Sequence, residues 1–427
     1  MLGLLGVVAF VMLFLGFPFF VILITSFLVV SFFFFPDLNP NILAQQILGG
    51  IKQTSVICVP MFMLAASIVT SGQAARRMIN MVKAFLGHMP GGLPIVTNVA
   101  CTLFGAVSGS TQATVASIGG VMRPMLLEAG YSSPFTLGLI INSSDIAFLI
   151  PPSIGFIVYG VATKTSVGKL FLAGILPGLL ICILFSIYCY FYSKFYNIGL
   201  YPKASWKERK QVVKKGILII GFPILILGGM YGGIFSPTEA AASSVLYALV
   251  LEGLVYRSLT FKKLIDVTLS TAEITAVCFI LMGAGQAISW LLSYSGIYKV
   301  IMPPLFGGEP SALRVIIIIN IAYFIACMFV DPIVAIFVLS PIFAPYIAQT
   351  GLDKVFIGVL VTMQAAIGSA TPPFGCDIFA AMVIFKKPYF EVIREIWVFI
   401  LILLFSVAIV VIFPELALFI PRHALGG

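Results

Sequence analysis

Long apolar runs constrain the fold of this sequence more than any other feature. Three of them cover residues 170–193, 212–232 and 396–420. A helix of about 20 residues spans the hydrocarbon core of a bilayer, which is about 30 Å thick. Only 9% of the residues are charged and 61% are hydrophobic, which excludes an ordinary soluble domain. The sequence predicts an all-α polytopic membrane protein, because the runs also lack the alternation of membrane β-barrel strands.

Lysine and arginine residues gather in four segments of the chain, at 76–83, 194–215, 257–263 and 386–394. Short loops rich in these residues stay in the cytoplasm, so the positive-inside rule predicts that all four segments are cytoplasmic. This placement accounts for the net charge of +9 without a nucleic-acid partner. We expect the other contacts of the chain to be with membrane lipid.

Two Pro-Pro pairs interrupt apolar sequence at equivalent places, in "LIPPSIGF" and in "SATPPFG". Pro151 and Pro372 lie 221 residues apart, and Pro124 and Pro345 have the same spacing. Proline removes a backbone donor and disfavours helical geometry in the residue before it, so each pair predicts a broken helix. Kinks in ordinary spanning helices are the alternative interpretation, but the matched spacing favours an internal repeat.

An apolar segment with a polar centre precedes each Pro-Pro pair. The polar centres are "SGST" at 108–111 and "VDP" at 330–332, and each predicts a re-entrant hairpin of two half-length helices. The basic loops place the two halves in opposite orientations. Inverted repeats with broken helices are typical of secondary transporters. The predicted units are a first repeat (1–200, with hairpin 92–128 and broken helix 132–168), a cytoplasmic linker (201–215) and a second repeat (216–427, with hairpin 313–350 and broken helix 353–385).

Unwound backbone inside a membrane must line a cavity or be buried in protein. Free carbonyl and hydroxyl oxygens suit Na⁺, and the N-terminal ends of half-helices suit a carboxylate. Ionisable residues inside spans are functional candidates, and here they are Asp145, Glu273, Asp331 and Asp377. Asp331 and Asp377 are also suited to capping the helices that follow them, and Glu239 to a capping box with Ser236.

Motifs of other chemistries are missing from the sequence. It has no P-loop, HExxH, GxGxxG or GxSxG pattern, and both histidines, His88 and His423, lie in loop or terminal sequence, far from any cysteine cluster. We therefore expect no enzymatic activity and no organic cofactor.

Several longer stretches resemble a known family. "GAVSGSTQATVASIGGVMRPMLLEAGY", "LFLAGILPG", "GGIFSPTEAAA" and "IGSATPPFG" are similar to the large membrane subunit of tripartite ATP-independent periplasmic (TRAP) transporters, in order and over nearly the whole chain. The resemblance implies an elevator-type fold of the ion transporter superfamily in the bacterial inner membrane. It also implies coupling to at least two Na⁺ ions, a small four-helix membrane subunit, a periplasmic substrate-binding protein and an organic acid substrate such as sialic acid or a C4-dicarboxylate.

The resemblance also implies roles for individual residues at the tips and breaks. The polar stretch "INSSDIAF" departs from the family pattern and leaves the role of Asp145 open. The implied ligands of a first Na⁺ are Ser108, Gly109, Ser110, Asp145 and Pro151. Those of a second Na⁺ are Phe329, Asp331, Gly368, Ala370 and Thr371. Substrate would contact Ser108, Ser110, Asn142, Ser143, Ser144, Asp145, Ser153 and Thr371.

One alternative function remains compatible with the same pattern. A one-component carboxylate carrier or antiporter, coupled to Na⁺ or H⁺, has a similar fold. Only a TRAP subunit requires a stable small membrane partner, so co-purification separates the two interpretations.

Overall fold

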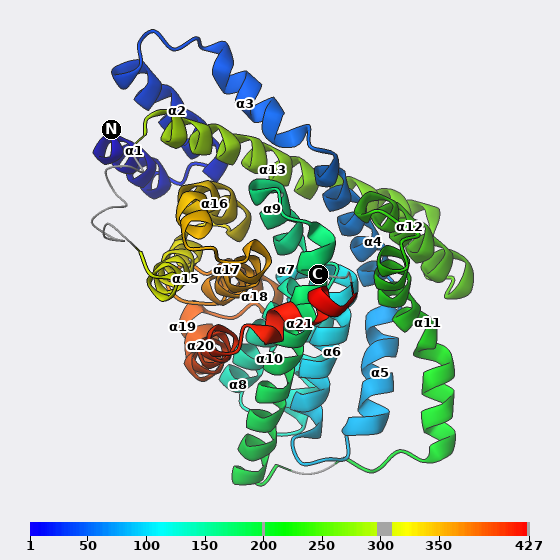
Figure 1. Ribbon diagram of the computed structural model, residues 1–427. Coiled ribbons are helices and arrows are strands. Elements are labelled where there is room, and N and C mark those ends of the chain that lie inside the picture. The colour runs from blue at the N-terminus through cyan, green and yellow to red at the C-terminus, as the bar shows by residue number, and fades with distance from the viewer. Residues whose placement is uncertain (199–200, 297–309, 425–427) are drawn as a thin grey trace.

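The computed structural model describes residues 1–198, 201–296 and 310–424, and every regular element within them is a helix (Figure 1). Six of these helices are long and apolar enough to cross a membrane, or up to eight if each bent pair counts as one span. The predicted all-α, multi-span class is therefore confirmed.

In the N-terminal part of the chain, α2, α3 and α4 lie beside the long helix α13 (Phe261–Tyr294) (Figure 1). A buried apolar cluster joins α2 to α13 through residues that include Phe27 and Leu291. The chain bends by 68° between α4 and α5. The elements of this part are α1 (Leu2–Phe14), α2 (Phe19–Phe34), α3 (Asn41–Ile51), η1 (Thr54–Ile57), α4 (Cys58–Ser71) and α5 (Ala74–Leu86).

Two helices, α6 (Gly92–Ser108) and α7 (Thr111–Glu128), meet at the "SGST" sequence. The next segment consists of α8 (Ser133–Ser144), the 3₁₀ turn η2 (Asp145–Phe148) and α9 (Ile154–Thr163), and residues 149–153 between them are not helical. This segment ends before the predicted limit of residue 168. The cause is local, because Lys164 adopts a left-handed conformation at φ 54° and Ser166 caps the following helix, α10 (Val167–Phe195).

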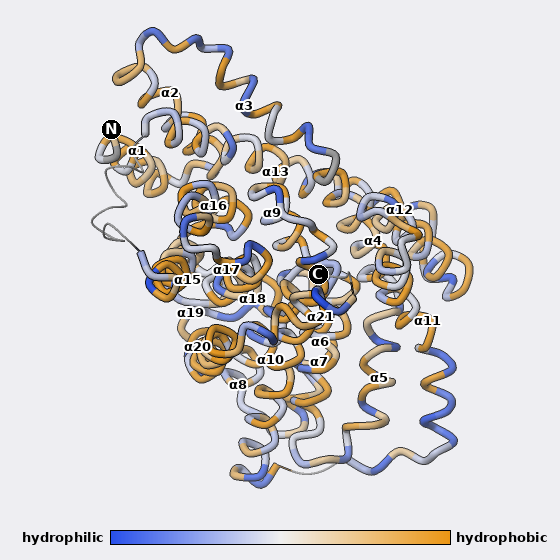
Figure 2. Tube along the Cα trace, viewed as in Figure 1, coloured by the Kyte–Doolittle hydropathy of each residue, from blue (hydrophilic) through white to orange (hydrophobic). Residues whose placement is uncertain are grey.

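The polar sequence at 201–215 is partly helical, since α11 (Trp206–Tyr231) begins inside it. Ser205 and Glu208 form a capping box there, and Ser236 and Glu239 form a second one at the start of α12 (Pro237–Leu249). The second box confirms the predicted capping role of Glu239. A π-helical turn, η3 (Val250–Val255), precedes α13. Hydrophilic residues cover the first turns of α11, whereas most other helices are coloured hydrophobic along their length (Figure 2).

The remaining helices repeat the order of a helix pair followed by an interrupted helix. The pair is α15 (Ala312–Phe329) and α16 (Pro332–Gln349), and a break at residues 370–375 separates α17 (Lys354–Ser369) from α18 (Cys376–Phe385). Both Pro-Pro peptide bonds, at residues 151–152 and 372–373, are cis. The chain ends with α19 (Tyr389–Ile393), α20 (Ile396–Ile412) and α21 (Glu415–Ala424).

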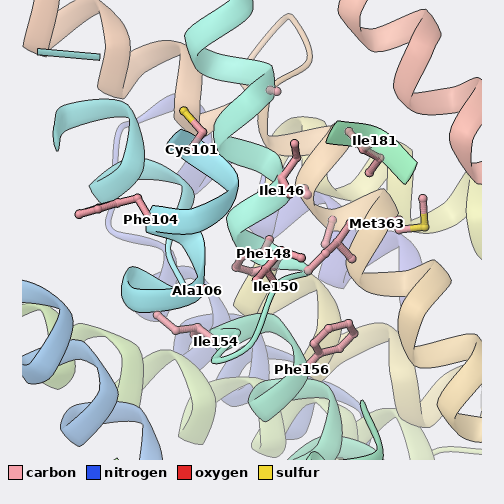
Figure 3. Close-up of a cluster of buried hydrophobic side chains, with 14 of the residues drawn as sticks. Cys101, Phe104, Ala106, Ile146, Phe148, Ile150, Ile154, Phe156, Ile181 and Met363 are labelled. Carbon is pink, nitrogen blue, oxygen red and sulfur yellow. The ribbon is translucent and has the colours of Figure 1, made fainter. Parts of the chain in front are cut away.

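A large buried apolar core joins both breaks to the helices around them. The backbone of the first break runs through this core, with Leu149, Pro151 and Ser153 all buried. In Figure 3 the side chains of Phe148, Ile150 and Phe156 lie together along this break, with those of α6 beside them. The unwound segment is therefore enclosed by protein, as its unpaired backbone groups require.

Candidate functional site

A cavity of about 740 Å³ lies where the tips of both helix pairs meet α4 and α13. Its wall combines segments from distant parts of the sequence. The first tip contributes Ser108, Ser110, Thr111, Gln112 and Ala113. Asp331, Pro332 and Ile333 come from the second. The ends of the helices beside the first break contribute Phe148 and Ile154, and those beside the second break contribute Ser369 and Cys376. The opposite wall consists of Met63, Ala66, Ser67, Thr70 and Ser71 of α4 and Asp266, Val267, Ser270, Ile274, Val277, Cys278 and Leu281 of α13.

The first tip packs directly against the first Pro-Pro break. Gly109 has φ +59°, and a Cβ atom built on it would lie 2.1 Å from the carbonyl oxygen of Pro152. The backbone amide of Ile154 donates a 3.4 Å hydrogen bond to the carbonyl of Gly109. Only glycine satisfies both the left-handed conformation and this close approach. The structure thus brings together Ser108, Gly109 and Ser110 with the break that contains Pro151.

The hydroxyl groups of the first tip are partly committed to local hydrogen bonds. Ser110 caps α7 by accepting from the amide of Ala113 at 3.5 Å. The hydroxyl of Ser108 lies 3.0 Å from that of Thr114. Ser153 caps α9 and donates to the carbonyl of Phe148 at 2.5 Å, and it does not line the cavity.

Asp145 is buried, with 1% of its surface exposed, and neither carboxylate oxygen has a hydrogen-bond partner among the described residues. The amide oxygen of Asn142 and the hydroxyl of Ser143 are likewise buried and unpaired there. Buried polar atoms without partners are costly and rare in proteins. The carboxylate of Asp145 is therefore the strongest unpaired oxygen donor in this segment, and such oxygens suit a hard cation. Direct contact with substrate would place the predicted substrate ligands of this segment on the cavity wall. None of the four lines it: Asn142, Ser143, Ser144 and Asp145.

The second tip presents a carboxylate to the cavity. Asp331 is the N-cap of α16, and its Oδ1 accepts a 2.9 Å hydrogen bond from the amide of Ile333, which confirms the predicted capping. Phe329 is 44% exposed, lies outside the cavity wall and contacts the ring of Phe374, with centroids 5.7 Å apart.

The second break lies close to the second helix pair. A Cβ atom on Gly368 would be 2.5 Å from the Cβ of Cys327, so the end of α17 packs tightly against the end of α15. Ala370 and Thr371 follow and are buried, and the hydroxyl of Thr371 donates to the carbonyl of Ile367 at 2.6 Å. Neither residue lines the cavity.

Asp377 connects the two halves of the site. Its Oδ1 accepts a 2.8 Å hydrogen bond from the hydroxyl of Thr111, and its Oδ2 accepts a 2.7 Å bond from that of Ser369. The predicted capping role of Asp377 is wrong, because Gly375 occupies the N-cap position of α18 and Asp377 lies in the first turn. The carboxylate instead holds the first tip against the second break.

Three carboxyl groups, on Asp145, Asp331 and Asp377, gather around the tips and breaks. Asp377 lies within electrostatic reach of both Asp145 and Asp331. Across the described ranges, the ion pairs are Lys387–Glu391 and Arg422–Glu415, and neither involves these carboxylates. The described residues also contain no group of three His, Cys, Asp or Glu side chains that could hold a metal ion.

Sequence reasoning missed the wall formed by α4 and α13. Ser67, Thr70 and Ser71 follow helical spacing on α4, and Asp266 and Ser270 do so on α13, so the polar stripe itself was visible. Glu273 was selected instead, but its side chain is exposed and lies outside the cavity wall.

Residues 6–416 match the family described as "Tripartite ATP-independent periplasmic transporter, DctM component". The chain belongs to the DctM family. It is therefore one component of a three-part transport system, and its multi-span fold is that of a membrane permease.

Relatives and one solved structure resemble this DctM-family chain over most of its length. The ectoine TRAP transporter large permease protein TeaC of Halomonas elongata is 53% identical over 410 residues, covering 96% of each chain. The C4-dicarboxylate TRAP transporter large permease protein DctM of Pseudomonas aeruginosa is 32% identical, covering 91% of each chain. The crystal structure of the YdaH transporter of Alcanivorax borkumensis has a TM-score of 0.62 at 14% identity, covers 86% of each chain and shares the fold.

Proposed function

We propose that this chain is the substrate-carrying membrane subunit of a Na⁺-driven importer for a zwitterionic solute of the ectoine class. The observation that carries the proposal is the cavity, because both tips and the residues that flank both breaks meet at its wall. Binding at the junction of two such elements is the arrangement that secondary transporters use near the bilayer midplane. The bacterial inner membrane is the proposed location.

Sodium coupling is supported by the chemistry of the buried oxygen atoms. The unpaired carboxylate of Asp145 and the nearby carboxylate of Asp377 would be stabilised by positive charge that the described side chains do not supply. Sodium ions would provide it while binding to carbonyl and hydroxyl oxygens. We propose that the first ion is held by Ser108, Gly109, Ser110, Asp145 and Pro151, and a second by Phe329, Gly368, Ala370 and Thr371 together with the backbone of Asp331.

The extent of the cavity supports an inward-open arrangement. The cavity runs from the tips to Ser71 at the end of α4 and to Asp266 near the start of α13. Both positions lie beside basic loops that we expect in the cytoplasm. We propose that the two helix pairs and both breaks form inverted repeats that move together, as in an elevator. This body would carry the substrate past α4 and α13.

The relative at 53% identity supports the proposed substrate. Ectoine carries one carboxylate and one positively charged amidine ring, so it belongs to the predicted class of organic acids. It differs from sialic acid and C4-dicarboxylates, which served as examples of that class, because it has a cationic group. Its carboxylate would bind near the N-terminal end of α7, where helix amides carry positive partial charge.

A reconstituted system tests this function. The chain would be purified with its small membrane subunit, placed in liposomes and supplied with the ectoine-loaded binding protein. We expect ectoine uptake that requires an inward Na⁺ gradient. Equal uptake under a proton gradient alone, without Na⁺, would overturn the coupling, and a system that transports only other acids would overturn the substrate.

A further inference from the structure

The charged side chains among the described residues of the cavity wall are all acidic. Two carboxylates line it, Asp331 from the second tip and Asp266 from α13. None of the described residues that line it is Lys, Arg or His. Proteins usually bind dicarboxylates and phosphates with such basic side chains, arginine above all. A doubly negative substrate would therefore meet two negative groups here and no positive side chain.

Asp331 is the better placed of the two carboxylates for direct recognition. Its backbone lies at the tip itself, and the bond from the amide of Ile333 fixes the position of Oδ1. The rest of its carboxylate has no ion-pair partner among the described residues. Asp266 lies on the opposite wall and is exposed, so solvent screens its charge more strongly.

We infer that the Asp331 carboxylate binds the cationic group of a zwitterionic substrate and thereby selects it over purely anionic acids. This inference rests on the proposed function, because it concerns the substrate of the same cavity. It gives the Asp331 carboxylate a role distinct from the Na⁺ ligation proposed for the backbone of this residue. A charge-assisted hydrogen bond from an amidine nitrogen would hold the ring at the second tip, leaving the carboxylate of the substrate to face the first tip.

The variant Asp331→Asn tests this role with little change in the fold. Asparagine caps helices about as well as aspartate, so the cap of α16 is kept while the charge is removed. Asp353→Asn is a matched control, since Asp353 caps α17 through a 2.7 Å bond from the amide of Val355 and lies outside the cavity wall. The probes are ectoine and 5-oxoproline, a ring carboxylate of similar size whose amide is neutral.

Binding would be measured as the rise in melting temperature of the purified membrane complex, in NaCl and in choline chloride. In the wild type we expect ectoine to stabilise the complex in NaCl and 5-oxoproline to have little effect. Asp331→Asn should raise the ectoine concentration needed for half of this stabilisation by about 10- to 100-fold, the usual loss for a charge-assisted bond. Its response to Na⁺ alone should stay at the wild-type level, and Asp353→Asn should behave as the wild type throughout.

Three results would overturn the inference. They are an unchanged ectoine response in Asp331→Asn, a wild-type preference for 5-oxoproline, and a loss of the Na⁺ response with the ectoine response intact, which would make Asp331 a sodium ligand only. A wild-type complex that transports a different substrate removes ectoine from the proposed function instead. The inference then survives only if that substrate carries a positive charge.

Discussion

The hydroxyl of Thr111 donates a 2.8 Å hydrogen bond to the carboxylate of Asp377, although 266 residues separate the two in the chain. Thr111 begins α7 at the first tip, and Asp377 lies in the first turn of α18 after the second break. This bond ties the two halves of the site together. A substitution at the first tip therefore alters the packing of the second break through the buried carboxylate of Asp377.

Thr111→Val should weaken this connection without changing the side-chain shape. The carboxylate of Asp377 would lose one of its two hydroxyl donors, at a cost of about 1–3 kcal/mol for a buried charged group. We expect a lower melting temperature and reduced Na⁺-dependent uptake. Thr362→Val is the control, because the hydroxyl of Thr362 is equally buried but donates to the Gly358 carbonyl of its own helix. Equal uptake by the two variants would show that the bridge does not matter for transport.

Gly109→Ala should disrupt the first tip. The added methyl would lie 2.1 Å from the carbonyl oxygen of Pro152, and φ +59° is unfavourable for alanine, so tip and break must separate. We expect loss of uptake at limiting Na⁺. Gly120→Ala is the matched control on α7, since a Cβ there meets nothing within 4 Å and alanine is the better helix former. Normal uptake by Gly109→Ala would contradict the packing described here.

Asp145→Asn should lower the affinity for Na⁺. The unpaired carboxylate is the strongest oxygen ligand in its buried set, and an amide would replace it with a weaker one. We expect the Na⁺ concentration for half-maximal uptake to rise by about 10-fold or more, in line with the loss of a charged partner. Glu273→Gln removes a charge from an exposed position on α13 and should leave this concentration unchanged. A Na⁺ dependence that is the same in all three proteins would move the ion elsewhere.

The loss of stability on acidification should depend in part on Glu391. The hydroxyl of Ser133 donates to its Oε1 at 2.6 Å, and Lys387 pairs with the same atom at 2.9 Å. These contacts, the Ser133 hydrogen bond first, hold the pKa of Glu391 below its ordinary value. A lowered pKa contributes stability above the unfolded-state value, and this contribution is lost as pH falls through the folded-state value.

The variant Glu391→Gln isolates this contribution. At neutral pH it should melt below the wild type, and the gap should close as the pH is lowered past the folded-state pKa. Melting temperature as a function of pH measures the difference. A gap of constant size at every pH would mean that the carboxylate charge contributes nothing.

Transport should depend on the other two components, as expected for a three-part system. This chain alone in liposomes, with ectoine and Na⁺ gradient present, should show little uptake. Addition of the small subunit and the loaded binding protein should restore it. Full activity of the isolated chain would favour the one-component carrier.

The positions of the helix ends were largely accessible from sequence, because they depend on local chemistry. The proline pairs at 151–152 and 372–373 predict interrupted helices, and residues 149–153 and 370–375 are indeed not helical. The capping boxes were equally local. The direction in which the side chains around these ends point was not predicted correctly. Consecutive residues of a helix point in different directions, so "NSSD" could not all face one cavity.

The composition of the cavity wall was less accessible, because it depends on long-range packing. Asp266 comes from a helix that neither repeat motif identifies, and only the approach of α13 to the tips brings it to the cavity. The bond between Thr111 and Asp377 is of the same kind. Sequence patterns identify such residues as polar, but not as neighbours.

The extension of the cavity toward the ends of α4 and α13 has a consequence for delivery. In the proposed orientation a loaded binding protein approaches from the side to which this cavity is closed. It can hand over its cargo only to the fraction of complexes that face outward at that moment. Its apparent dissociation constant then equals the intrinsic one divided by that fraction. Any agent that favours the outward-facing arrangement, such as Na⁺, would therefore act as if it had raised the concentration of complexes that can accept the binding protein.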